Sequence, residues 1–112
     1  MEVTYREQNG IYIVTARGEL DLSSAPLMRA EFDKVIEKRA AVVLVDFAEV
    51  TYIDSSGLAT IIDALQRTKK YKARLALCGL NQVVRNVLEI ARLDSVFTIF
   101  PDEQTALQKL QG

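Results

Sequence analysis

The sequence predicts an α/β domain with a mostly parallel sheet, an N-terminal antiparallel hairpin and about four helices. An Asn9-Gly10 dipeptide separates two short β-rich segments, and Asn-Gly is a frequent hairpin turn. Apolar β-branched segments then alternate with amphipathic helical stripes, as in parallel sheets with right-handed crossovers. The length of 112 residues fits a single domain covering residues 1–112.

The hairpin opens the chain. Its two strands are expected at residues 3–7 and 11–17, and residues 18–21 are expected to form a loop. The next helix should begin at the Ser23-Ser24 pair, with Pro26 in its first turn, because a capping hydroxyl followed by proline is typical of a helix start.

The middle of the chain predicts the central strand between two helices. The first helix has a one-sided apolar stripe made of Met28, Phe32, Val35 and Ile36, and it should end near residues 37–39. The uninterrupted apolar run at residues 40–45 predicts a strand that is buried on both faces. A second amphipathic helix should start just after residues 54–57, and its stripe is Leu58, Ile61, Ile62 and Leu65.

The remaining segments continue the alternation. Residues 74–78 predict a short strand that ends at Gly79, and Asn81 is the expected N-cap of a third helix. Residues 96–100 predict the last strand. Asp102 is the expected N-cap of the final helix.

The composition excludes several classes of function. There is no histidine and one cysteine, Cys78, so imidazole catalysis, an intrachain disulfide and a Cys-rich zinc site are excluded. The scattered glycines form neither a dinucleotide-binding fingerprint nor a P-loop. A net charge of -1 gives no general attraction to nucleic acid or anionic membranes. With no signal peptide and no long apolar run, we expect a cytoplasmic protein without a cofactor, metal or membrane insertion, in which Cys78 is a buried hydrophobe.

Residues 53–57, Ile-Asp-Ser-Ser-Gly, are the segment with the clearest chemistry. They lie where a buried strand turns into a helix, which is where open α/β sheets place their sites. Asp54 or Ser55 could simply cap the helix, with Gly57 easing a tight turn. Alternatively, the helix N-terminus binds an anion. A serine hydrolase is excluded, because the glycine that must precede the nucleophile by two positions is missing and no histidine is present.

The third interpretation of this segment is that one of its serines is phosphorylated. A phosphate would gain from the helix dipole by roughly 0.3–1 kcal/mol. It would also place about two negative charges beside Asp54. The fold would tolerate that change, whereas a partner docked on this surface would not, so the segment suits a modification that switches binding.

Two segments carry a resemblance to a known family. Gly18-Glu19-Leu20-Asp21 and residues 50–58, Val-Thr-Tyr-Ile-Asp-Ser-Ser-Gly-Leu, resemble the STAS domain family, specifically the bacterial anti-sigma factor antagonists. Residues 84–93 and 97–106 are similar to the C-terminal half of that family. The resemblance covers nearly the whole chain in the same order of elements, and it implies a single STAS-like domain.

The resemblance also implies a mechanism of regulation. In the family, an anti-sigma factor that is a serine/threonine kinase phosphorylates the second serine of the motif, which is Ser56 here, with Ser55 as the alternative. The unphosphorylated antagonist binds the kinase and frees the sigma factor, and a serine phosphatase resets the switch. Asp21 matches an acidic loop position near that serine in the family, which makes it a candidate contact to the kinase or its nucleotide, and a local turn former is an equal alternative. The implied partner-binding residues are Asp21, Asp54, Ser55, Ser56, Gly57 and Leu58.

Two other functions stay open at this point. One is a STAS scaffold or adaptor subunit of a stress-signalling or transport complex. The other is a nucleotide-binding STAS module that uses the N-terminus of the second helix. The sequence alone sets no oligomeric state.

Overall fold

The computed structural model describes residues 1–111 and confirms the predicted order of elements, β-β-α-β-α-β-α-β-α. The strands are β1 (Glu2–Gln8), β2 (Ile11–Leu20), β3 (Val42–Ile53), β4 (Arg74–Cys78) and β5 (Thr98–Phe100). The helices are α1 (Ala25–Glu37), α2 (Ser55–Lys70), α3 (Gln82–Ile90) and α4 (Glu103–Leu110). The sheet has the order β1-β2-β3-β4-β5, in which β1 is antiparallel to β2 and the other neighbours are parallel.

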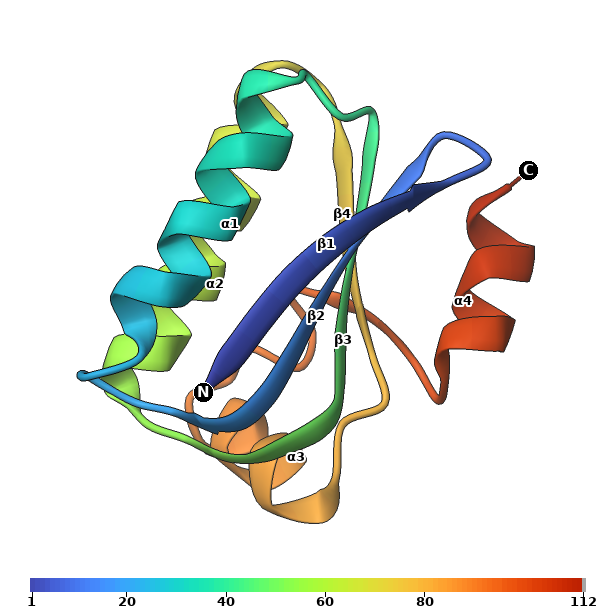
Figure 1. Cartoon of the computed structure of the whole chain (residues 1–112). Coiled ribbons are helices and arrows are strands. Elements are labelled where there is room, and N and C mark those ends of the chain that lie inside the picture. Colours follow the sequence, from blue (N-terminus) through green and yellow to red (C-terminus); the bar gives the residue numbers. More distant parts are fainter. Residues whose placement is uncertain (112) are drawn as a thin grey trace.

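The helices cover the two faces of the sheet unequally. Helices α1, α2 and α3 lie on one face, and α4 lies on the other (Figure 1). The central strand β3 supplies both cores, because Val43 and Val45 face the larger core while Leu44 faces the smaller core under α4. All three side chains are fully buried. This alternation explains the uninterrupted apolar run that predicts a doubly buried strand.

The opening hairpin is confirmed. Gln8 pairs with Ile11 across a two-residue turn, and Asn9 and Gly10 have φ values of 53° and 83°. Positive φ at both positions is characteristic of a type I′ turn, whose twist matches that of the two strands. Asparagine and glycine are the residues that adopt this conformation at least cost.

Both β2 and β3 are longer than the sequence predicts. The prediction of a loop at residues 18–21 is wrong for the first three of these residues, because β2 continues to Leu20. Likewise β3 does not stop at residue 45 but continues to Ile53, with Leu20 and Ile53 as the last pair. Register shifts near Thr15 and Gly18 interrupt the alternation of side chains along β2. Because β4 pairs with β3 only as far as Asp46, the second half of β3 lacks the continuous apolar pattern of its first half.

Two shorter segments also differ from the prediction. The last strand begins at Thr98 rather than at residue 96, and Val96 is 48% exposed in a turn. The first helix has Ser24 at its N-cap position, but the Ser24 side chain makes no capping bond. Its hydroxyl instead donates to the carbonyl oxygen of Glu19 at 2.7 Å, so the serine stabilises the loop rather than the helix.

Cys78 lies at the end of β4 and is fully buried, as the sequence predicts. Burial, together with the nearby carboxylate of Asp46, raises the pKa of the Cys78 thiol to about 12. The thiolate is the reactive form of cysteine, so this side chain acts as a small hydrophobe. Within residues 1–111, no helix combines the length and the apolar character needed to cross a bilayer.

Candidate functional site

Two connections lie side by side at the carboxyl ends of β2 and β3 (Figure 1). One leads from β2 into α1, and the other leads from β3 directly into α2. The backbone N–H of Asp54 donates to the carbonyl oxygen of Leu20 at 3.1 Å, which fixes the second connection to the first. We call residues 54–58 the serine segment.

The Asp54 carboxylate joins the two connections. One of its oxygens accepts the backbone N–H of Gly57 at 3.0 Å, and the other accepts the backbone N–H of Leu22 at 3.2 Å. The first bond confirms Asp54 as the N-cap of α2. The second bond holds the β2–α1 connection against the start of that helix. Asp54 is therefore a positioning residue for both sides of the site.

Ser55 and Ser56 occupy the first turn of α2, because the helix begins at Ser55 and not after residue 57. Ser55 is exposed and Ser56 is half-buried. The carbonyl oxygen of Ser56 accepts the hydroxyl of Thr60 at 3.0 Å, whereas neither serine hydroxyl has a hydrogen-bond partner among residues 1–111. Both hydroxyls are therefore available for modification without loss of an internal bond.

Gly57 is required by packing and not by a turn. An ideal Cβ at this position would lie 2.7 Å from side-chain carbons of Ile53 and Leu20, and 2.8 Å from the carbonyl oxygen of Leu20. The interpretation that Gly57 eases a tight turn is wrong, because the residue lies inside α2. The absence of a side chain lets α2 start in contact with the ends of β2 and β3.

Asp21 organises the β2–α1 connection. Its carboxylate accepts the hydroxyl of Ser23 at 2.8 Å and the backbone N–H groups of Ser23 and Ser24, each at 3.1 Å. These bonds lower the pKa of Asp21 below its ordinary value. The bond from the Ser23 hydroxyl has the largest effect, and the bond from the Ser24 backbone has the next largest. This geometry confirms the turn-forming role of Asp21. A contact between Asp21 and a partner stays a prediction.

Three exposed apolar side chains lie on the elements that lead into or follow the two connections, and the sequence prediction missed them. Leu22 is 75% exposed, Leu27 in the first turn of α1 is 51% exposed, and Tyr52 near the end of β3 is 45% exposed. Leu58 differs, because it is half-buried and packs against the main core. Of the three, Leu22 is fixed beside the serine segment, because its backbone N–H donates to the Asp54 carboxylate, and exposed apolar side chains can belong to protein interaction surfaces. Leu22 was detectable as an apolar residue in a polar loop.

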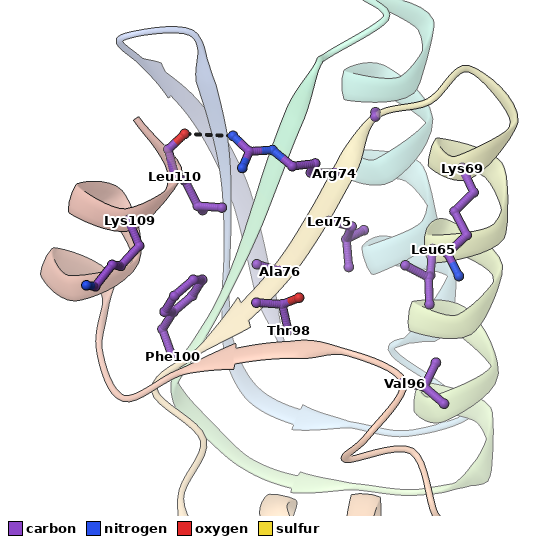
Figure 2. Close-up of a pocket in the computed structure, with 11 residues that line it drawn as sticks. Leu65, Lys69, Arg74, Leu75, Ala76, Val96, Thr98, Phe100, Lys109 and Leu110 are labelled. Carbon is purple, nitrogen blue, oxygen red and sulfur yellow. Dashed lines mark hydrogen bonds between the residues drawn. The ribbon is translucent and has the colours of Figure 1, made fainter. Parts of the chain in front are cut away.

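A separate hollow of about 340 Å³ lies at the other end of α2, against β4, β5 and α4. Leu65 and Lys69 line it from α2, while Phe100 and Leu110 line the opposite side (Figure 2). Arg74 donates to the carbonyl oxygen of Leu110 at 2.8 Å across its upper end. Helix α2 has 16 residues and is about 24 Å long, so this hollow is remote from the serine segment.

The chain belongs to the STAS domain family, whose family model matches residues 2–106. A similar curated protein is the anti-sigma F factor antagonist of Paenibacillus polymyxa, with 25% identity over 112 residues, covering 99% of this chain and 96% of the relative.

Solved structures show the same fold. A crystal structure of an anti-sigma factor antagonist from Thermotoga maritima superposes with a TM-score of 0.92 at 23% identity, covering 98% of this chain and 95% of the other. The Bacillus cell fate determinant SpoIIAA in its phosphorylated form gives a TM-score of 0.76 at 18% identity, covering 97% and 99% of the two chains. The mixed sheet with its antiparallel opening hairpin is thus the STAS fold.

Replacing Asp54 by alanine should destabilise the fold and loosen the β2–α1 connection. The variant loses a helix cap and a second backbone bond, which together contribute roughly 1–3 kcal/mol. Urea denaturation measures the loss, and amide hydrogen exchange should accelerate at Leu22 and Gly57. Asp102→Ala removes a cap from the short helix α4 and is the matched control, since it should leave exchange at Leu22 unchanged. Unaltered protection of Leu22 in Asp54→Ala would contradict the bridging role.

Replacing Gly57 by alanine should lower the free energy of unfolding by roughly 1–3 kcal/mol, because the added methyl group overlaps a backbone oxygen and two core side chains. Helix propensity alone predicts the opposite sign, a gain of up to about 1 kcal/mol. Chemical denaturation distinguishes the two outcomes. Ser55→Ala, at an exposed position of the same helical turn, should change stability by less than about 0.5 kcal/mol.

Proposed function

We propose that the protein is an anti-sigma factor antagonist whose partner binding is switched by phosphorylation at Ser56. In the unphosphorylated form it binds an anti-sigma factor that is a serine/threonine kinase, and the sigma factor is released. Phosphorylation of Ser56 by that kinase ends the binding, and a serine phosphatase restores it. The protein has no catalytic activity of its own in this scheme. A partner of this kind works in the cytoplasm, so we expect the protein there as well.

The observation that carries the proposal is the position of Ser56. Its hydroxyl has no hydrogen-bond partner within the described chain, and the residue stands at the start of a helix that Asp54 holds against the connection carrying the exposed Leu22. A kinase that docks on Leu22, Leu27 and Tyr52 would find this hydroxyl within its contact surface. Membership of the STAS family and the names of the similar proteins support the same assignment.

Electrostatics explains why phosphorylation would act on binding and leave the fold intact. The helix dipole and the unpaired N–H groups at the start of α2 stabilise a phosphate by roughly 0.3–1 kcal/mol. The Asp54 carboxylate, which already accepts two N–H groups, opposes that gain by repulsion between like charges. The net effect on folding is therefore small. By contrast, burying about two additional negative charges in an apolar interface is strongly unfavourable.

The choice between the two serines rests on the family motif, in which the second serine is modified. Ser55 is the more exposed of the two, so exposure alone does not select Ser56. The nucleotide-binding alternative gains no support from the hollow, which lies at the opposite end of α2 from the serine segment. The scaffold alternative predicts binding that is insensitive to charge at position 56, and the experiment below includes that outcome.

The test compares wild type, Ser56→Ala, Ser56→Asp and the matched control Ser55→Ala as bait in lysate of the source organism. We expect wild type, Ser56→Ala and Ser55→Ala to retain an anti-sigma factor with a kinase domain, identified by mass spectrometry. Ser56→Asp should retain it at least tenfold less well, a loss of about 1.4 kcal/mol. Circular dichroism verifies that each bait is folded.

The captured complex is then incubated with ATP, and the modified residue is mapped. Phosphate on Ser56 supports the site assignment. Phosphate on Ser55 in the folded Ser56→Ala protein overturns the assignment of the site but leaves the antagonist function standing. Equal retention of the same partner by all four baits overturns the switch itself and favours a scaffold.

A further inference from the structure

The first strand leaves one whole edge of the sheet unpaired. Among residues 1–111, β1 is the terminal strand of the sheet order, pairs only with β2 and spans seven residues. In Figure 1 no further strand lies beyond it. Unpaired edge strands of this length present backbone donors and acceptors to another chain. The fifth strand, at the other edge, has three residues and offers a much shorter template.

The hairpin turn determines which backbone groups of β1 face outward. In a two-residue hairpin the residues that flank the turn form a hydrogen-bonded pair, here Gln8 and Ile11. Hydrogen-bonded and non-hydrogen-bonded positions alternate along an antiparallel strand. Val3 and Tyr5, at odd positions, therefore direct their N–H and C=O groups away from β2 and toward solvent.

The side chains of residues 2–6, Glu-Val-Thr-Tyr-Arg, are complementary to themselves about Thr4. If the strand is reversed and placed beside itself with Thr4 opposite Thr4, Glu2 faces Arg6 at both ends. In the same arrangement Val3 of one strand faces Tyr5 of the other. These two side chains lie on the face of the sheet opposite to Glu2 and Arg6, where both are half-buried against the main core. Centring the pair on Arg6 instead would oppose two like charges, so the charges favour one register.

We propose that β1 is a self-association surface, on which β1 of a second copy of this chain adds antiparallel about a twofold axis at Thr4. Val3 of each chain forms a hydrogen-bonded pair with Tyr5 of the other, and each such pair exchanges both of its N–H···O bonds. Opposite charges face each other at Glu2 and Arg6, which stabilises this cross-strand arrangement. The result is one continuous sheet across an isologous interface.

Existing ion pairs on β1 are compatible with this arrangement. Arg6 contacts Glu103 of α4, and a carboxylate oxygen of Glu2 lies 3.2 Å from a guanidinium nitrogen of Arg17 in β2. All four side chains are on the surface of the molecule, where such pairs contribute little and rearrange readily. In the dimer Arg6 would lie between Glu103 of its own chain and Glu2 of the second copy.

The dimer would not block the site proposed above. Because the two β1 strands are antiparallel, the two serine segments lie at opposite ends of the joined sheet and both stay open. The inference is independent of phosphorylation at Ser56. Pairing along five residues buries less than the surface typical of a stable dimer, so we expect dissociation in the micromolar range, about 1–100 µM.

Charge exchange tests the partner residues. In sedimentation velocity, wild type should show a monomer–dimer equilibrium that weakens with added salt. Glu2→Arg alone and Arg6→Glu alone should each weaken self-association about tenfold, because each opposes like charges twice. Mixing the two variants should restore dimers, since the arginine introduced at position 2 of one chain would face the glutamate introduced at position 6 of the other. Glu103→Gln removes only the intramolecular partner of Arg6 and is the control that should dimerise like wild type.

Cysteine cross-linking tests the register. Thr4 would oppose its own copy at a non-hydrogen-bonded position, where Cβ atoms are close, so Thr4→Cys should form a covalent dimer under mild oxidation. Gln8→Cys is the matched control on the same face of β1, beyond the paired residues, and should cross-link at least tenfold more slowly. The buried Cys78, with its raised pKa, does not compete.

The proposal is overturned if wild type stays monomeric well above the micromolar range. It is equally overturned if dimers persist in both charge variants, or if Gln8→Cys cross-links as fast as Thr4→Cys, because a different surface would then be responsible. Circular dichroism of each variant establishes that it is folded before these results are interpreted.

Discussion

The site depends on the two hydrogen bonds that the Asp54 carboxylate accepts. It accepts the N–H of Gly57 at the start of α2 and the N–H of Leu22 in the β2–α1 connection. Two segments that are far apart in the sequence are thereby held at one end of the sheet. The close contact of Gly57 with Leu20 and Ile53 lets the helix begin directly at the strand ends. Without these two contacts, the start of α2 would not be held against the β2–α1 connection.

This arrangement separates the stability of the fold from the chemistry of the surface. The carboxylates of Asp21 and Asp54 are engaged by hydrogen bonds, whereas the hydroxyls of Ser55 and Ser56 have no partner in the part of the chain that the structure describes. A change at either hydroxyl therefore costs the fold little and alters what the surface presents to a partner. That separation is what a phosphorylation switch needs, because the modified protein must stay folded to be reset.

The order of elements was predictable because each signal is local. The Asn9-Gly10 turn, the caps Asn81 and Asp102 and the apolar run of β3 each specify their own structure. The ends of β2 and β3 were not predictable, since residues 18–20 and 50–53 become strand by pairing with each other. The role of Gly57 was missed for a similar reason: its constraint comes from Leu20, which is distant in sequence. The position of the exposed Leu22 beside the serine segment also comes from a distant contact, the hydrogen bond from its backbone N–H to Asp54.

We propose that charge at Ser56 changes a surface and not the fold, and NMR of the chain with phosphoserine incorporated at position 56 distinguishes these two effects. Chemical-shift changes should be confined to the serine segment and the β2–α1 connection, with core amides and the unfolding midpoint unchanged. Shifts that spread through the β3 and β4 core, or a clear loss of stability, would show that the charge alters the fold. In that case phosphorylation would act by remodelling the domain itself.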